Sequence, residues 1–193
     1  MKRVGLLGGT FNPIHVGHLA MAQIASEKLR LDKVIFVPCH IPPHKTIRGL
    51  VSAQNRFNMV RLAIKDYPRF EVSDCEILRK GKSYTIDTVR HFQDTLPKKT
   101  KLLFIIGEDA LGGLDKWKDS KKLQKLVSFI VVNRPGCQSR AKVKGKFKFV
   151  NMPDIDIASS FLRKCITDGK SIKYFVSDNV YRYIKRHHLY ATR

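Results

Sequence analysis

The chain has 193 residues, 43% of them hydrophobic, which is enough to bury a sizeable core in a single domain spanning residues 1–193. No stretch is long and apolar enough for a membrane span, and the first residues lead into an apolar strand rather than a secretory signal, so we expect a cytoplasmic protein without a membrane partner. The net charge of +21 keeps open the alternative of a nucleic-acid-binding module.

The distribution of this charge favours a solvated basic surface. Lysine and arginine are spread along the chain, with local clusters at residues 98–101, 140–148 and 182–188. No run of interleaved basic and aromatic residues resembles an RNA-binding motif. We therefore expect no specific nucleic-acid partner and only weak, nonspecific binding to polyanions.

The cysteines are scattered without a CxxC pair, which indicates neither a disulfide framework nor a zinc knuckle. A reducing cytoplasm fits this pattern, and we expect the thiols to be buried as small hydrophobic side chains. The four residues are Cys39, Cys75, Cys137 and Cys165.

The first predicted element is a buried strand at residues 4–7, followed by the sequence GGTFNPIHVGH at residues 8–18. Its two glycines allow a sharp turn or the close approach of a ligand, and Pro13 prevents a helix before it. Apolar residues recur at helical spacing from Gly17 onward, so a helix begins near that residue. Its N-terminus offers free N–H groups and the positive end of the helix dipole, which predicts a phosphate site.

Two histidines stand at the start of this helix. His15 and His18 are three residues apart, so both imidazoles lie on one face, where they can donate hydrogen bonds to phosphoryl oxygens. A metal site is the alternative, because Cys39, His40 and His44 would supply further ligands. A zinc hydrolase of the HExxH type needs a glutamate between its histidines, and this sequence has none there, so we favour phosphate contact.

The second strand is predicted at residues 34–37, a continuous apolar run ended by Pro38, as in a parallel strand buried on both faces. Residues 39–50 are rich in proline and cations and form a loop at the carboxyl end of this strand, where ligands gather in open α/β sheets. His44 and Lys45 are candidate anion ligands in this loop, although exposed loop cations are common.

The next segment is predicted to be mainly supporting structure. A serine N-cap precedes a helix over residues 53–65, and a short strand follows near residues 70–72. After a turn at residues 79–82, a helix begins within the sequence SYTIDT, residues 83–88, and runs to Leu96. From the residues alone, this helix start is an ordinary capping segment.

The most strand-like run, residues 102–106, ends at a glycine followed by two carboxylates. Gly107 and Asp109 thus stand at the carboxyl end of a strand, where a carboxylate can contact a ribose. Trp117 is the only tryptophan and lies among polar residues rather than in an apolar periodic segment. We therefore expect it outside the core, free to stack on an aromatic ring.

Two more strands, residues 127–132 and 147–150, flank a basic loop. Strands that alternate with helices at this spacing imply right-handed βαβ units. The sequence thus predicts a doubly wound, mostly parallel α/β sheet of the Rossmann type, with helices on both faces and the site above its carboxyl edge.

Near the C-terminus, Ser159 and Ser160 mark the start of another helix, and Arg163 lies within one turn of them. N–H groups, hydroxyls and a guanidinium can thus converge on one anion. Serine caps are common, so this motif gains weight from its combination with the histidine pair. A last helix around residues 179–186 is predicted to be a packing element.

These motifs resemble those of the HxGH nucleotidyltransferase superfamily and, within it, of the bacterial nicotinate-nucleotide adenylyltransferases. The resemblance rests on GGTFNPIHVGH, PPHK, SYTIDT, the GxD and LxxW segments and the serine-arginine motif, and it covers nearly the whole chain. Asn12 stands where many relatives carry aspartate, and Ala158 and Ser160 replace a serine and a threonine. Phosphopantetheine adenylyltransferases and cytidylyltransferases share the first and last motifs, but SYTIDT and the tryptophan loop favour a pyridine substrate.

The resemblance implies transfer of AMP from ATP to nicotinate mononucleotide with release of pyrophosphate, and Mg²⁺ accompanying ATP without a dedicated protein metal site. It implies that the catalytic residues are His15, His18 and Arg163. It implies an ATP site of Gly8, Gly9, Thr10, Phe11, His18, Gly107, Asp109, Ser159, Ser160 and Arg163. It implies a nicotinate mononucleotide site of Thr10, His44, Lys45, Thr85, Trp117 and Arg134. The sequence leaves the oligomeric state open, and a homo-oligomer is one alternative.

Overall fold

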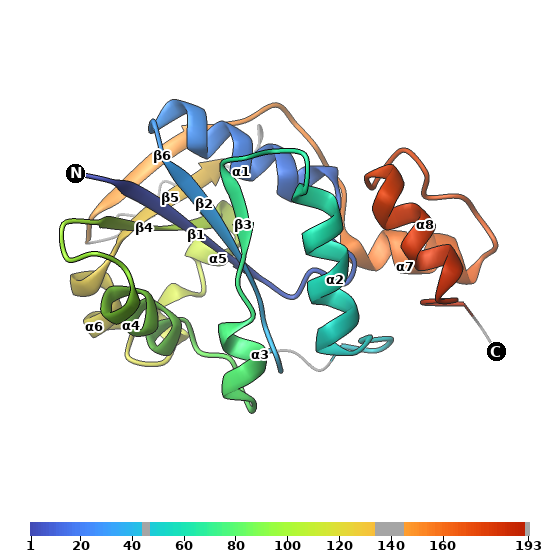
Figure 1. The fold of residues 1–193 in the computed structure, drawn as a ribbon, viewed down its shortest axis with the longest axis horizontal. Coiled ribbons are helices and arrows are strands. Elements are labelled where there is room, and N and C mark those ends of the chain that lie inside the picture. The colour runs from blue at the N-terminus through green and yellow to red at the C-terminus, as the bar shows by residue number, and fades with distance from the viewer. Residues whose placement is uncertain (44–46, 134–144, 192–193) are drawn as a thin grey trace.

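The structure is a computed structural model that describes residues 1–43, 47–133 and 145–191. These residues form a sheet of six parallel strands in the order β3-β2-β1-β4-β5-β6 (Figure 1). This is the doubly wound α/β architecture that the sequence predicts. The strands are β1 (Arg3–Gly9), β2 (Lys33–Pro38), β3 (Phe70–Val72), β4 (Lys101–Gly107), β5 (Ser128–Asn133) and β6 (Phe147–Asn151).

The helices that the sequence predicts are present, but several short ones were not predicted. The helices are α1 (Val16–Lys28), α2 (Ala53–Ile64), α3 (Cys75–Arg79), α4 (Thr85–Thr95), α5 (Glu108–Leu111), α6 (Ser120–Leu126), α7 (Ser159–Thr167), α8 (Asp178–Arg186) and a single 3₁₀ turn (Leu114–Lys116). The unpredicted helices α3, α5 and α6 have four to seven residues. Segments this short span two turns at most, so they show too few apolar positions for helical periodicity to be recognised.

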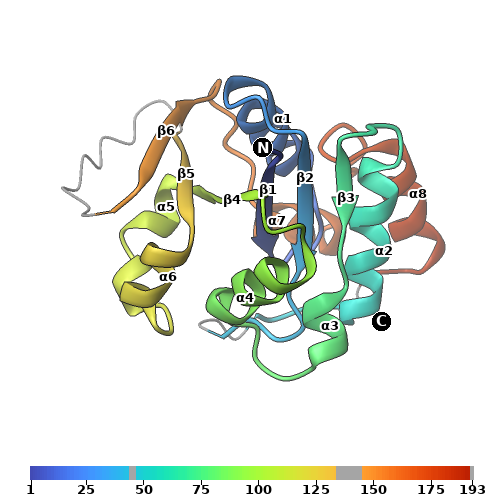
Figure 2. The ribbon, with the colours of Figure 1, turned by 60° about the vertical axis from the view of Figure 1, so that its left-hand side comes forward.

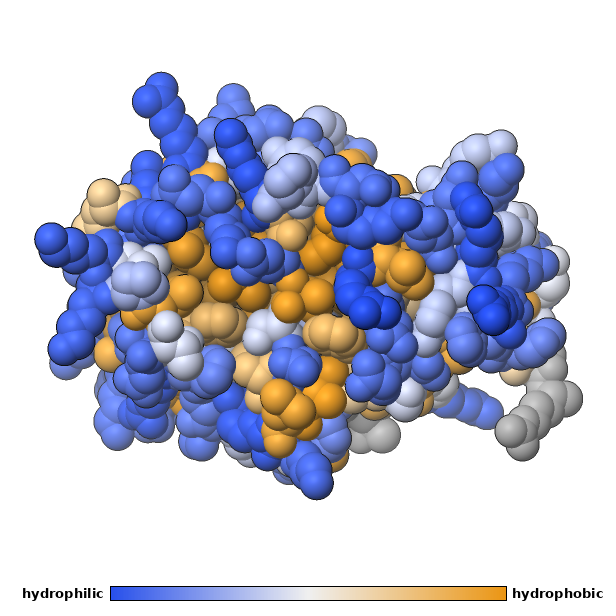
Figure 3. All heavy atoms as spheres, viewed as in Figure 1, coloured by the Kyte–Doolittle hydropathy of each residue, from blue (hydrophilic) through white to orange (hydrophobic). Residues whose placement is uncertain are grey.

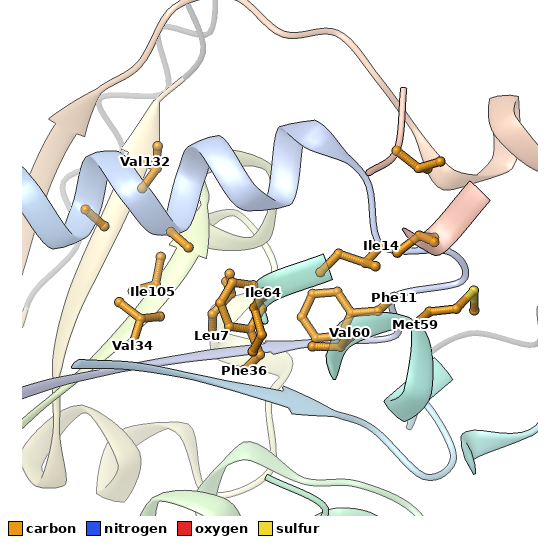
Figure 4. Close-up of a cluster of buried hydrophobic side chains, with 14 of the residues drawn as sticks. Leu7, Phe11, Ile14, Val34, Phe36, Met59, Val60, Ile64, Ile105 and Val132 are labelled. Atoms are coloured by element: carbon orange, nitrogen blue, oxygen red, sulfur yellow. The ribbon is translucent and has the colours of Figure 1, made fainter. Parts of the chain in front are cut away.

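Helices cover both faces of the sheet and divide the core into two clusters. In β4, Leu103 and Ile105 pack toward one face, whereas Leu102, Phe104 and Ile106 pack toward the other. The first cluster lies against α1, α2, α7 and α8, and Figure 4 shows strand side chains meeting those of α2 there. The second cluster lies against α4 and α6. Burial of both faces explains why the inner strands are continuous apolar runs.

The C-terminal helix α8 packs on α2 beyond the β3 edge of the sheet (Figure 2). It buries Val180 and Ile184, each worth about 1.5–3 kcal/mol relative to exposure. The hydroxyl of Tyr183 donates to Asn55 Oδ1 at 2.9 Å and accepts from Asn58 Nδ2 at 3.0 Å. This docking carries the end of the chain toward the loop that follows β1.

Hydrophilic residues make up most of the face drawn in Figure 3. Figure 3 shows hydrophobic residues gathered across the middle of one face and hydrophilic residues around them. None of the helices in the described ranges is long and apolar enough to cross a membrane. The expectation of buried thiols is confirmed for Cys39 and Cys165 and is wrong for Cys75, which is only half-buried, while Cys137 lies outside the described residues.

Candidate active site

The candidate site lies where the sheet reverses its direction of winding. β1 and β4 are neighbours, with β2 and β3 on one side of them and β5 and β6 on the other. Crevices at such switch points, beyond the carboxyl ends of the strands, are where open α/β sheets bind ligands. The loop at residues 10–15 follows β1 there, and Gly107 ends β4 at the same edge.

The turn after β1 is shaped by a glycine and a buried phenylalanine. A Cβ atom at Gly9 would lie 2.8 Å from Cζ of Phe11, so only glycine lets this ring fold back on the strand. Phe11 itself has a φ of 49° and its side chain is 2% exposed. Its ring meets the His18 ring edge-on, with the centroids 5.1 Å apart. The buried side chain of Phe11 therefore packs against His18.

The two histidines contact one another at the start of α1. His15 is the N-cap residue, and its backbone N–H donates to Nδ1 of His18 at 3.3 Å. In neutral His18 the proton is therefore on Nε2. The two ring centroids are 3.8 Å apart. A Cβ at Gly17 would lie 3.1 Å from Nδ1 of His15, so the glycine between the histidines allows this close packing.

The serine-arginine motif lies beside the histidine loop, although about 150 residues separate them in sequence. Ser159 Oγ donates to the carbonyl oxygen of Pro13 at 2.9 Å. Arg163 Nη1 donates to the carbonyl oxygen of Asn12, also at 2.9 Å. Ser160 is exposed at the start of α7. Two helix N-termini, a histidine pair and a guanidinium thus meet, and together they can hold a polyphosphate.

Asn12, which the sequence analysis noted only as a departure from the family motif, is a buried supporting residue. Its side chain is 2% exposed, and Nδ2 donates to the carbonyl oxygen of Gly49 at 3.1 Å. Oδ1 accepts from the N–H of Val51 at 3.3 Å and from the hydroxyl of Tyr190 at 2.9 Å. Burial raises the pKa of Tyr190, so this hydroxyl remains a donor. The bond to Gly49 requires an N–H donor, which gives a physical reason for an amide rather than a carboxylate here.

Arg56 is a second supporting residue that the sequence analysis did not single out. Its side chain is fully buried in α2, and Nη1 donates to the carbonyl oxygen of Thr10 at 2.9 Å. Nη2 donates to the carbonyl oxygen of His40 at 2.8 Å, and Nε to that of Val51 at 3.2 Å. One guanidinium therefore joins the ends of β1 and β2 to the start of α2. Burial raises the pKa of the neighbouring Cys39 thiol, which stays protonated.

The SYTIDT segment is held beside the end of β2. The N–H of Ser83 donates to the carbonyl oxygen of Ile41, and Ser83 Oγ accepts from the N–H of His40, both at 2.9 Å. Buried Glu76 accepts a hydrogen bond from the hydroxyl of Thr88, and desolvation raises the pKa of this carboxyl. These contacts place Thr85, the first residue of α4, at the carboxyl edge of the sheet.

Trp117 follows the 3₁₀ turn and is half-buried, so the expectation that it lies outside the core is only partly correct. Its ring meets Phe104 of β4 edge-on at a centroid distance of 6.2 Å. Lys118, the next residue, reaches α4, where Nζ lies 3.1 Å from Oδ2 of Asp87 and 4.5 Å from the ring centroid of Tyr84. The tryptophan loop and the SYTIDT segment are therefore in contact.

The structure describes some of the remaining predicted site residues, and the others lie outside its described ranges. Asp109 is exposed on α5, and a Cβ at Gly107 would collide with its Oδ1, so the carboxylate bends back over the end of β4. Gly8 lies in β1, and Thr10 directly follows that strand. Three predicted residues fall outside the described ranges; they are His44, Lys45 and Arg134. Across the described ranges, no group of three or more His, Cys, Asp or Glu residues could hold a metal ion.

Comparison with known proteins places the chain in a family. The family described as cytidylyltransferase-like matches residues 6–166. A protein from Shouchella clausii named "Probable nicotinate-nucleotide adenylyltransferase" is 45% identical over 99% of this chain and 98% of its own length. One of the same name from Clostridium tetani is 38% identical over 98% and 100%.

Solved structures agree at the level of the fold. A Plasmodium falciparum nicotinic acid mononucleotide adenylyltransferase complexed with NaAD superposes with a TM-score of 0.82, at 22% identity, over 98% of each chain. With the relatives of 38–45% identity along almost its whole length, the chain belongs to the nicotinate-nucleotide adenylyltransferase family.

Proposed function

We propose that this protein transfers AMP from ATP to nicotinate mononucleotide, giving nicotinate adenine dinucleotide and pyrophosphate. The observation that carries the proposal is the meeting of the histidine loop with Ser159 and Arg163 at the switch point of the sheet. The family to which the chain belongs supports the choice of substrates.

The reaction needs alignment and charge neutralisation more than proton transfer. The phosphate of the mononucleotide is already ionised near neutral pH, so one of its oxygens can attack the α-phosphorus of ATP directly. As this P–O bond forms, the bond from the α-phosphorus to the bridging oxygen breaks, and pyrophosphate leaves with that electron pair. Donors that strengthen their contacts as charge develops lower the barrier.

Each residue at the meeting point has a role in this scheme. The Nε2–H of His18 donates to the α-phosphoryl oxygens, and His15 holds His18 in this tautomer through its backbone N–H. Arg163 uses one N–H on Asn12, and the rest of its fork holds the β- and γ-phosphates. The first turns of α1 and α7 supply further N–H groups to the phosphates.

ATP is expected to enter as its Mg²⁺ complex. The donors gathered around the histidine loop are imidazole, guanidinium, hydroxyl and backbone N–H groups, which bind phosphate oxygens rather than a hard cation. Magnesium would thus be carried by the triphosphate and water as part of the substrate, with few dedicated protein ligands.

The pyridine ring is assigned to a binding position between Thr85 and Trp117, here called the slot. N–H groups at the start of α4 would receive the carboxylate of nicotinate, whereas the amide of nicotinamide would set an NH₂ donor against them. We expect kcat/KM for nicotinate mononucleotide to exceed that for nicotinamide mononucleotide by at least roughly a hundredfold. Steady-state rates with the two substrates measure this, and comparable values would contradict the assignment of the slot.

A substrate panel tests the proposed reaction. Pyrophosphate release is followed with ATP or CTP as donor and with nicotinate mononucleotide or phosphopantetheine as acceptor, and the product is identified by mass spectrometry. We expect the dinucleotide with ATP and nicotinate mononucleotide only. Efficient turnover of phosphopantetheine or of CTP would replace the proposed function with one of the related transferases.

A further inference from the structure

Lys118 makes two contacts with the helix start to which the carboxylate of the pyridine ring is assigned. Its ammonium lies 3.1 Å from Asp87 Oδ2 and 4.5 Å from the centroid of the Tyr84 ring. Both partners belong to the SYTIDT segment, and they flank Thr85 in sequence. Lys118 directly follows Trp117, so this contact joins the two segments that bracket the ring.

Asp87 brings a negative charge to a place where the substrate would bring another. It lies in the first turn of α4, two residues from Thr85, and its side chain is 27% exposed. The N-cap residue of this helix, Tyr84, makes no side-chain hydrogen bond to it, and the positive end of the helix dipole there favours an anion. An unpaired carboxylate in the same turn would repel a carboxylate bound there.

We propose that Lys118 is a specificity-determining residue that neutralises Asp87 and thereby allows the slot to prefer nicotinate over nicotinamide. This inference rests on the proposed function and adds to it the origin of the acid preference. The two mononucleotides differ by one negative charge in the ring substituent, so a change in the local charge acts on the acid and leaves the amide nearly unaffected.

The charge role differs measurably from a bracing role. If Lys118 only held the tryptophan loop against α4, its loss would loosen the slot and weaken both substrates to a similar extent. If its charge offsets that of Asp87, its loss weakens the acid alone, and removal of the Asp87 charge as well restores the preference.

The experiment measures kcat/KM for both mononucleotides at saturating ATP in the wild type, Lys118→Met, Lys118→Arg and the double variant Lys118→Met/Asp87→Asn. Methionine keeps an apolar stem of similar length without the charge. Lys122→Met is the matched control, because Lys122 is an exposed lysine nearby that pairs with Asp119 rather than with α4.

We expect Lys118→Met to lower kcat/KM for the acid roughly three- to tenfold and that for the amide less than about twofold. Lys118→Arg and the double variant should return the acid-to-amide ratio to within about twofold of the wild type. Lys122→Met should leave both values unchanged.

Equal losses for both substrates in Lys118→Met, or no loss for either, would overturn the inference. A double variant that keeps the low acid-to-amide ratio of Lys118→Met would also overturn it. Failure of the proposed function gives a different result, because the wild type itself would then form no dinucleotide from nicotinate mononucleotide.

Discussion

A single backbone contact determines which ring nitrogen of neutral His18 carries the proton. The N–H of His15 donates to Nδ1 of His18, and the Phe11 ring makes an edge-to-face contact with the same imidazole. Gly17 provides the space for the His15 ring beside the helix. The glycine of the HxGH sequence therefore lets the two imidazoles pack together, and the three-residue spacing places both of them on one face of the helix.

His18 is expected to act mainly on the transition state. Its substitution by alanine should lower kcat about a hundredfold or more, with a smaller change in KM, because its contact strengthens as charge develops on the phosphoryl oxygens. Steady-state kinetics with ATP and nicotinate mononucleotide measure this. His91→Ala, at an exposed position of α4, is the control. A His18→Ala enzyme with nearly unchanged kcat would remove the proposed role.

Arg163 depends on the shape of its side chain as well as on its charge. Arg163→Lys keeps the charge but loses the planar fork that can hold Asn12 and a phosphate together. We expect kcat/KM for ATP to fall by about tenfold or more. Arg182→Lys, on the exposed side of α8, should have no effect. Unchanged kinetics with ATP in Arg163→Lys would show that a point charge is sufficient.

At the scale of elements, buried polar groups join segments that the sheet alone leaves separate. The guanidinium of Arg56 connects α2 to the ends of two strands, and Asn12 connects the β1–α1 loop to the C-terminal segment through Tyr190. Such networks are stabilising only when every member has a partner. The site is thus held in place by contacts beneath it as well as by its own loops.

Removal of Arg56 should destabilise the whole fold. Arg56→Ala leaves a cavity and deprives the carbonyl oxygens of Thr10 and His40 of their donor, so we expect a loss of about 3 kcal/mol or more in the free energy of unfolding. Urea denaturation followed by circular dichroism measures this. Arg61→Ala, exposed on the same helix, should stay within about 0.5 kcal/mol of the wild type. Similar losses in the two variants would contradict the role of Arg56.

At the scale of the whole molecule, part of the positive charge gathers at the edge of the sheet opposite the site. A hollow of about 530 Å³ lies at the amino ends of β4 and β5, and no carboxylate is among the described residues that line it. Its cations are Lys98, Lys101, Lys125 and Lys146. This position separates the excess charge from the residues assigned to catalysis.

Polyanion binding should therefore be independent of catalysis. We expect weak, sequence-independent binding of duplex DNA that falls steeply as salt rises from about 50 to 200 mM. Replacing the four lysines of the hollow by glutamine should reduce the slope of log K against log salt by at least roughly one, and leave kcat/KM unchanged. Fluorescence anisotropy at several salt concentrations measures the slope. Sequence-specific binding, or a loss of turnover in the glutamine variant, would contradict this separation.

The sequence by itself determined the doubly wound sheet, the glycine turn, the histidine pair and the serine-arginine helix start, because each depends on local periodicity, turn geometry or capping. It could not determine the supporting contacts, since their partners lie far apart in the chain: Tyr190 and Asn12 are 178 residues apart, and Arg163 and Asn12 are 151. The burial of Arg56 could have been predicted from the sequence, because this position shares the apolar face of α2 with Met59 and Val60. Its hydrogen-bond acceptors could not, because they are carbonyl oxygens of other segments. Backbone acceptors have no signature in the sequence, so only the tertiary structure decided which side chains hold the site in place.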